Sequence, residues 1–125
     1  MTPEQFREEF ERVWPWLEPA VKAYADTSSK DDVWTRISDG RADLWTTQNA
    51  AVVTTIEVMM NGKKSLNGWL AGGDLADIQQ LEPMLADWGR HQGCEFFTLV
   101  CRPGFERKLS GFSRKAVILI KDLTP

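Results

Sequence analysis

"LNGWLAGGDLADIQQLEPML", residues 66–85, decides how the rest of the chain is interpreted. The stretch predicts a strand that runs into two glycines, Gly72 and Gly73, and then a helix. That layout is typical of a phosphate-binding loop, because the first amides of a helix are free donors at the positive end of the helix dipole. The helix begins at Asp74, however, and Asp77 lies in its first turn. An aspartate there is a good N-cap, so we favour a loop whose free amides are occupied by its own carboxylate.

The residues well before this stretch predict two helices. A capping box at Thr2 and Gln5 starts an N-terminal helix, which Pro15 and Pro19 kink or divide into two. Residues 29–40 carry a second capping box and a closing glycine, and they predict a short helix.

Three strands follow, and we expect them to form an antiparallel meander. Residues 41–48 and residues 50–60 predict the first two strands, and the second of these is rich in β-branched residues. Asn61 and Gly62 are a strong hairpin signal, so residues 63–71 return as the third strand.

The residues after the two glycines predict a strand–helix–strand unit. Apolar residues at helical spacing from Leu75 to Trp88 predict a helix that Gly93 ends, and residues 94–101 read as a buried central strand. This order implies a parallel strand pair with a right-handed crossover. A short helix and turn in residues 102–113 and a final strand in residues 115–123 complete the chain. The fold class is therefore α+β, with a mixed sheet.

Composition limits the classes of function. A length of 125 residues, 42% of them hydrophobic, predicts a single domain over residues 1–125 with a real core. The net charge of -3 argues against a general nucleic-acid binder, which usually has a basic surface. No apolar run approaches the roughly 20 residues of a membrane span, and the charged N-terminus is not a signal peptide. We expect a cytoplasmic protein that binds no membrane.

The thiols and the one histidine give no sign of a metal centre. Cys94 and Cys101 lie on one predicted strand, about 23 Å apart, so both are expected to be free thiols. Only His91 is available as an imidazole ligand and no CxxC pair exists, so no metal site is predicted. His91 lies near the end of the long helix, where it complements the helix dipole.

The order of elements resembles the fold of the GNAT (GCN5-related N-acetyltransferase) family. The usual first strand of that fold has no clear counterpart here, and neither has its usual last strand. The stretches "GRADLW", "AVVTTIEV", "LAGGDL", "LADWGRHQGC" and "RPGFERKLSGF" are more narrowly similar to small GNAT-like proteins of bacteriophages and prophages. The resemblance implies a site for acetyl-CoA, or another acyl-CoA, at the junction of the third strand and the following helix. On this resemblance the cofactor-binding residues are Leu70, Ala71, Gly72, Gly73, Asp74, Leu75, Arg102 and Arg107.

The catalytic groups that the resemblance implies are only partly present. Many GNAT enzymes use a tyrosine shortly before a Gly-Phe pair as the general acid, but Arg107 lies near that position here, and the only tyrosine is Tyr24. The third strand offers Ser65 and Asn67 as polar groups. Glu57 on the second strand is the candidate general base, against the alternative of a solvated carboxylate.

Three functions remain open at this point. The first is an acyl-CoA-dependent N-acyltransferase. The second is a non-catalytic virion, assembly or host-interaction protein of a phage, with a phage or host protein as its partner, since a fold does not by itself imply chemistry. The third, nucleic-acid binding, is disfavoured by the charge. The oligomeric state is open, although an exposed hairpin edge could pair with another subunit.

Overall fold

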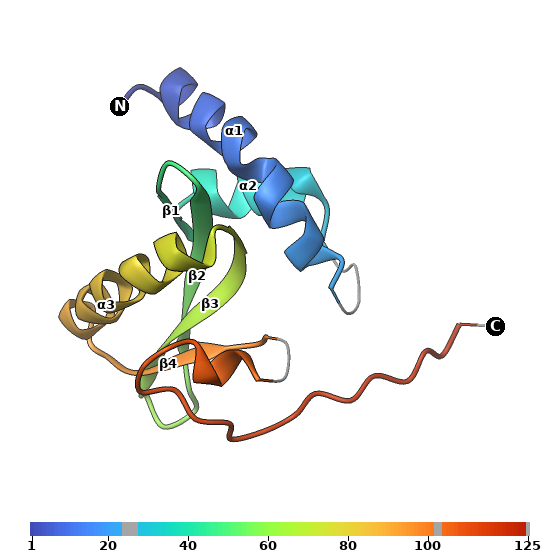
Figure 1. Ribbon diagram of the computed structural model, residues 1–125, viewed down its shortest axis with the longest axis vertical. Coiled ribbons are helices and arrows are strands. Elements are labelled where there is room, and N and C mark those ends of the chain that lie inside the picture. The colour runs from blue at the N-terminus through green and yellow to red at the C-terminus, as the bar shows by residue number, and fades with distance from the viewer. Residues whose placement is uncertain (24–27, 102–103, 125) are drawn as a thin grey trace.

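The computed structural model describes residues 1–23, 28–101 and 104–124, and in them a four-stranded sheet carries helices on both faces (Figure 1). The strand order is β1-β2-β3-β4. Helices α1 and α2 cover one face and α3 covers the other, as two separate hydrophobic clusters show. The α+β class with a mixed sheet is thus confirmed.

The two N-terminal helices begin at the predicted capping boxes. Helix α1 is Pro3–Val21, and the Thr2 side chain accepts a hydrogen bond from the Gln5 amide at its start. Both internal prolines lie within this one helix, so it is not divided into two. Helix α2 is Lys30–Ser38, and Ser29 with Asp32 forms its capping box.

The predicted meander is present. Strands β1 (Asp43–Thr46), β2 (Ala50–Val58) and β3 (Lys64–Gly73) pair antiparallel in chain order. Gly62 adopts a φ of +86° in the turn between β2 and β3, as the Asn-Gly signal requires.

The strand–helix–strand unit is also confirmed, but the place of its last strand was predicted wrongly. Helix α3 is Leu75–His91, and β4 is Cys94–Leu99, which pairs parallel to β3. Strand β4 is the edge of the sheet rather than a central strand, and 50% of Phe96 is exposed. A continuous apolar run is expected for a strand that lies between two others. The sequence of the run does not show whether the second neighbouring strand is present.

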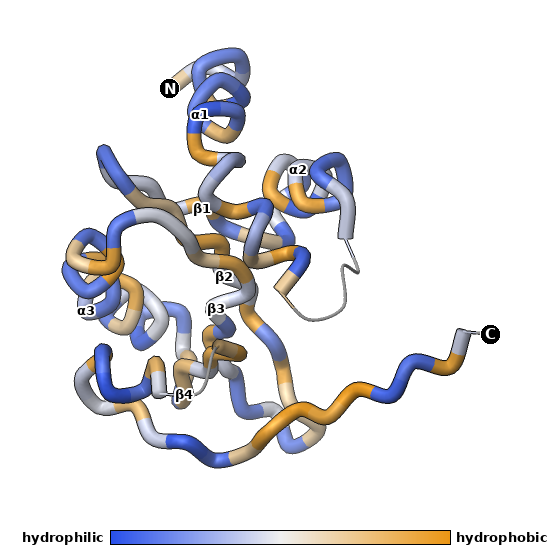
Figure 2. Tube along the Cα trace, turned by 45° about the vertical axis from the view of Figure 1, so that its right-hand side comes forward, coloured by the Kyte–Doolittle hydropathy of each residue, from blue (hydrophilic) through white to orange (hydrophobic). Residues whose placement is uncertain are grey.

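The end of the chain differs most from expectation. The predicted short helix is present as η1 (Phe105–Arg107), but residues 115–123 do not form the predicted final strand. They run as extended chain away from the sheet (Figure 1). Figure 2 shows a hydrophobic run within this segment, with hydrophilic residues on either side of it. A strand is defined by hydrogen bonds to a partner, so β propensity alone does not form one.

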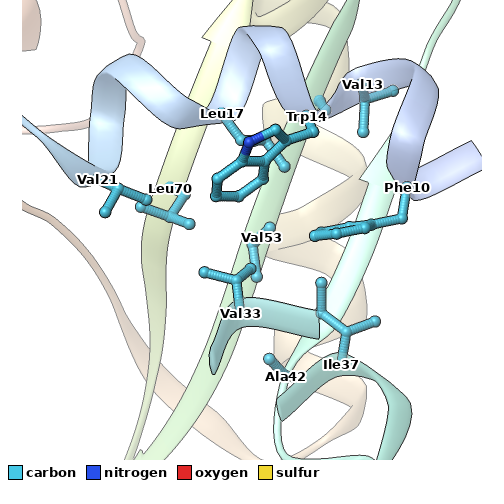
Figure 3. Packing of buried hydrophobic residues seen from close by; sticks show 11 residues of the cluster. Phe10, Val13, Trp14, Leu17, Val21, Val33, Ile37, Ala42, Val53 and Leu70 are labelled. Atoms are coloured by element: carbon cyan, nitrogen blue, oxygen red, sulfur yellow. The ribbon is translucent and has the colours of Figure 1, made fainter. Parts of the chain in front are cut away.

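The larger cluster lies between α1, α2 and the sheet. Phe10, Val13, Trp14 and Leu17 of α1 meet Val53 and Leu70 of the strands (Figure 3). The smaller cluster, under α3, contains Val52, Leu66, Leu81 and Leu85. Neighbouring residues Val52 and Val53 therefore point to opposite faces, as a strand buried on both sides requires.

Candidate functional site

Strands β3 and β4 separate part-way along the sheet. They pair from Lys64 with Cys94 to Gly68 with Leu99, whereas β3 continues to Gly73. Along the side that faces β4, the segment Trp69–Gly73 has no strand partner within the part of the chain that the structure describes. We call Trp69–Gly73 the open edge of β3, and the place where the two strands part the fork. Free backbone groups on such an edge can bind an extended ligand.

A β-bulge at Trp69 marks the fork. Val53 pairs with Leu70 while Thr54 pairs with Gly68, so Trp69 is the extra residue on β3. The bulge changes which face the strand presents: Leu66 packs under α3, but Leu70, four residues later, packs under α1. In a regular strand these two side chains would share a face.

Both glycines at the end of β3 have structural causes. A Cβ on Gly72 would lie 1.8 Å from the carbonyl oxygen of Trp16, so Gly72 lets α1 approach the strand. Gly73 has a φ of +102°, and a Cβ there would lie 2.2 Å from the carbonyl oxygen of Asn49. Neither glycine needs a bound phosphate to explain it.

The two acids at the start of α3 are hydrogen-bonded within the protein. The Asp74 carboxylate accepts a 2.8 Å hydrogen bond from the Ala76 amide, which is the predicted N-cap. The Asp77 carboxylate accepts from the Thr47 hydroxyl at 2.6 Å and from the Asn49 amide at 3.3 Å. Asp77 therefore joins the start of α3 to the β1–β2 turn.

The segment after β4 lies against the first turns of α3. The Gln79 side chain donates a 2.8 Å hydrogen bond to the Lys108 carbonyl, and Leu109 is buried. The rings of Phe97 and Phe112 meet edge to face at 5.2 Å. This segment thus stands beside the fork, with Arg107 exposed at the end of η1, while Arg102 lies outside the described residues.

Polar side chains run across the sheet next to the fork, on the face opposite α3. The Asn67 amide donates to the Thr55 hydroxyl at 3.3 Å, and the Thr98 hydroxyl lies 3.3 Å from both Asn67 Oδ1 and Ser65 Oγ. We call these four residues the polar row. Ser65 is fully buried and Thr98 is exposed, so the row connects the interior with the surface. Thr55 and Thr98 were not predicted as site residues, because each lies within a mainly apolar strand sequence.

The structure does not bring Glu57 to the glycine loop. Glu57 pairs with Ser65, eight positions before Gly73 on β3, which corresponds to about 26 Å along the strand. It lies only three positions from Gly68 at the base of the fork, or about 10 Å. The side chain of Glu57 is exposed.

Neither the two thiols nor the histidine belongs to the polar row beside the fork. Cys94 and Cys101 are free, as predicted, and burial raises the pKa of the Cys101 thiol, with the Glu106 carboxylate acting in the same direction. His91 Nδ1 lies 2.9 Å from the Asp87 carbonyl one turn earlier on α3. Over residues 1–23, 28–101 and 104–124, no three His, Cys, Asp or Glu side chains gather in a way that could hold a metal ion.

Comparison with solved structures identifies the fold. Over 93% of both chains, the structure matches glucosamine-6-phosphate N-acetyltransferase from Arabidopsis thaliana, with a TM-score of 0.58 and 16% identity. An acetyltransferase from Trypanosoma brucei matches with a TM-score of 0.54 and 16% identity, over 85% of this chain and 89% of that one. A protein from Thermus thermophilus matches with a TM-score of 0.55 and 13% identity, over 78% of this chain and 82% of that one. At these identities the likeness shows the GNAT-like fold alone.

The sequence itself matches no protein-family model and none of the curated proteins. In the part of the chain that the structure describes, no helix is both long enough and apolar enough to span a bilayer.

Proposed function

We propose that this chain is an acyl-CoA-dependent N-acyltransferase of the small phage or prophage type, with its cofactor in the fork between β3 and β4. The observation that carries the proposal is the fork itself: β3 continues past its last partner on β4, beside the start of α3, in a fold shared with acetyltransferases. The resemblance of the sequence to phage GNAT-like proteins supports a phage or prophage origin.

The open edge of β3 fits the amide-containing arm of an acyl-CoA. An extended ligand that carries amides can exchange hydrogen bonds with a free strand edge, as an added strand does. The start of α3 fits the pyrophosphate less well, because Asp74 occupies an amide there and carries a negative charge. Binding is therefore expected to be weak.

The polar row and Glu57 are the groups on this chain that can serve an amine acceptor. An acyl-CoA, when bound, would supply a thioester carbonyl to the amine, so that a C–N bond forms, the C–S bond breaks and CoA leaves with the proton that the amine gives up. Thr98 is exposed at the outer end of the row and Asn67 lies next to the fork, so their oxygens can orient the N–H groups of an acceptor. Glu57 lies about 10 Å along the strand from the base of the fork, so it can take up the proton only through a chain of waters. Tyr24, the only tyrosine, lies outside the described residues.

A second candidate is a non-catalytic phage protein that uses the same scaffold to bind a phage or host protein. The hydrogen bonds of Asp74 and Asp77 favour it, because both acids are explained by folding without any ligand. Affinity for acyl-CoA distinguishes the two candidates.

Titration calorimetry of the full chain with acetyl-CoA and with CoA tests the proposal. We compare the unchanged chain with Asp74→Asn, which keeps an N-cap but removes the charge, and with Asp74→Gly. Asp87→Asn, at an exposed acid near the other end of α3, is the matched control. We expect weak binding by the unchanged chain and binding about two- to fivefold tighter by Asp74→Asn, the effect of one charge at a helix start. No heat of binding from any of the four proteins would exclude acyl-CoA as the ligand and favour the second candidate.

A further inference from the structure

The last residues that the structure describes include an apolar segment whose side chains are mostly exposed. We call residues 113–124 the C-terminal arm. Its sequence from Ala116 to Ile120, "AVILI", has high β propensity and is flanked by Lys115 and Lys121. The apolar side chains are exposed by fractions between 54% (Ile120) and 90% (Leu119). A run of this kind on a folded protein marks an interaction surface.

Among the described residues, no strand pairs with the outer edge of β4. Strand β4 pairs with β3 on one side and is last in the strand order of the described residues. Phe96 and, just beyond the strand, Val100 are each about half exposed, and the Lys63 ammonium lies 5.9 Å from the centre of the Phe96 ring. An unprotected apolar edge is a template for another strand, because its N–H and C=O groups are unpaired.

Each of these two features supplies what the other lacks, and every copy of the chain carries both. We propose that two copies exchange C-terminal arms, each arm adding to the outer edge of the partner's β4 as an antiparallel strand. The exchange is mutual, so the assembly closes as a two-fold dimer and leaves no arm uncovered.

The position of the arm points to another copy rather than to the same chain. Phe112 is fixed against Phe97 of its own β4, and from there the arm leads away from the sheet (Figure 1). Fully extended, residues 113–124 reach up to about 40 Å, which is enough to cross to a neighbouring sheet.

Charge and hydropathy select a register for the pairing. Placing Lys121 opposite Glu95 pairs opposite charges. The same register puts Leu119 opposite Phe97 and Ile120 opposite Phe96. The apolar run of the arm then lies along β4, and among its residues only Ile118 lies opposite a polar side chain, that of Thr98.

Sedimentation analysis of the full chain at micromolar concentration is the first test. We expect a dimer whose dissociation constant rises at least about tenfold in Leu119→Lys, because a charge then enters the apolar pairing. Thr124→Lys adds the same charge at an exposed position beyond the apolar run and should remain as dimeric as the unchanged chain. A monomer for the unchanged chain, or equal dissociation constants for the two variants, would overturn the proposal.

Disulfide trapping separates exchange between copies from pairing within one chain. In a background of Cys94→Ala and Cys101→Ala, one preparation carries Thr98→Cys and another carries Ile118→Cys, two positions that the register places opposite each other. We expect oxidation of the mixture to give a covalent heterodimer that reducing agent separates. If the mixture stays monomeric while a chain that carries both changes closes an internal disulfide, the arm folds onto its own sheet and the exchange is wrong.

Discussion

At the scale of single residues, the two glycines before α3 show how a binding motif and a packing motif can share one sequence. Gly72 and Gly73 read as a phosphate loop, yet each is required by a close backbone contact. Gly72 allows α1 to lie against β3, and Gly73 adopts a backbone conformation that L side chains rarely reach. The same loop can still bind a ligand, but the glycines do not report one.

Gly72→Ala should therefore destabilise the fold whether or not a ligand binds. The new Cβ would overlap the Trp16 carbonyl, so α1 must shift, and we expect a loss of about 1–3 kcal/mol in the free energy of unfolding. Urea unfolding followed by tryptophan fluorescence measures it. Ala71→Ser, at the exposed neighbouring position, is the control. Equal stability of the two variants would mean that α1 does not approach β3 as described.

At the scale of elements, α1 is attached to the sheet by a charged contact as well as by its apolar face. The Arg12 guanidinium donates to the carbonyls of Thr47 at 2.8 Å and Gln48 at 3.0 Å in the β1–β2 turn. Glu9 pairs with Arg12 and accepts a 2.9 Å hydrogen bond from the Thr46 hydroxyl. This contact attaches α1 to the β1–β2 turn, which lies beside the end of β3.

This contact predicts a pH dependence of stability. The hydrogen bond from Arg12, helped by that from Thr46, holds the pKa of Glu9 below its ordinary value of 4.5. Ionised Glu9 thus stabilises the fold above pH 4.5, and this contribution is lost as the pH falls through the lowered pKa.

Glu9→Gln should accordingly cost stability at pH 7, by less than about 1 kcal/mol for a partly exposed pair, and cost less at about pH 3. Glu8→Gln removes the same charge from an exposed position of the same helix. Urea unfolding of both variants at the two pH values measures the difference. An equal loss for Glu9→Gln at both pH values would contradict the role of its charge.

At the scale of the whole molecule, β4 has a strand partner on one side only and the C-terminal arm is exposed, over the residues that the structure describes. The proposed exchange resolves both, and it predicts where backbone amides are protected. In the dimer, amides of residues 116–120 should exchange with solvent at least about tenfold more slowly than in Leu119→Lys, because strand pairing protects them.

Hydrogen exchange followed by mass spectrometry measures this protection. Thr124→Lys should show the slow exchange of the unchanged chain. Fast exchange of residues 116–120 in a protein that sediments as a dimer would place the dimer contact elsewhere.

The sequence by itself determined the features that depend on neighbours a few residues away. The capping boxes at Thr2 and Ser29, the turn at Gly62 and the cap at Asp74 were all predicted, since each is formed by local hydrogen bonds or by a local backbone conformation. The strand–helix–strand order followed from hydrophobic periodicity, and it led to the correct fold class.

Only the tertiary structure decided the features that depend on distant partners. The bulge at Trp69, the fork, the contact of Gly72 with Trp16, and the separation of Glu57 from the loop all arise from segments far apart in the sequence. Residues 115–123 have the apolar and β-branched composition of a strand, but they form none within the described structure. Whether they become one depends on a partner edge, because a strand exists only through hydrogen bonds that its own residues cannot supply.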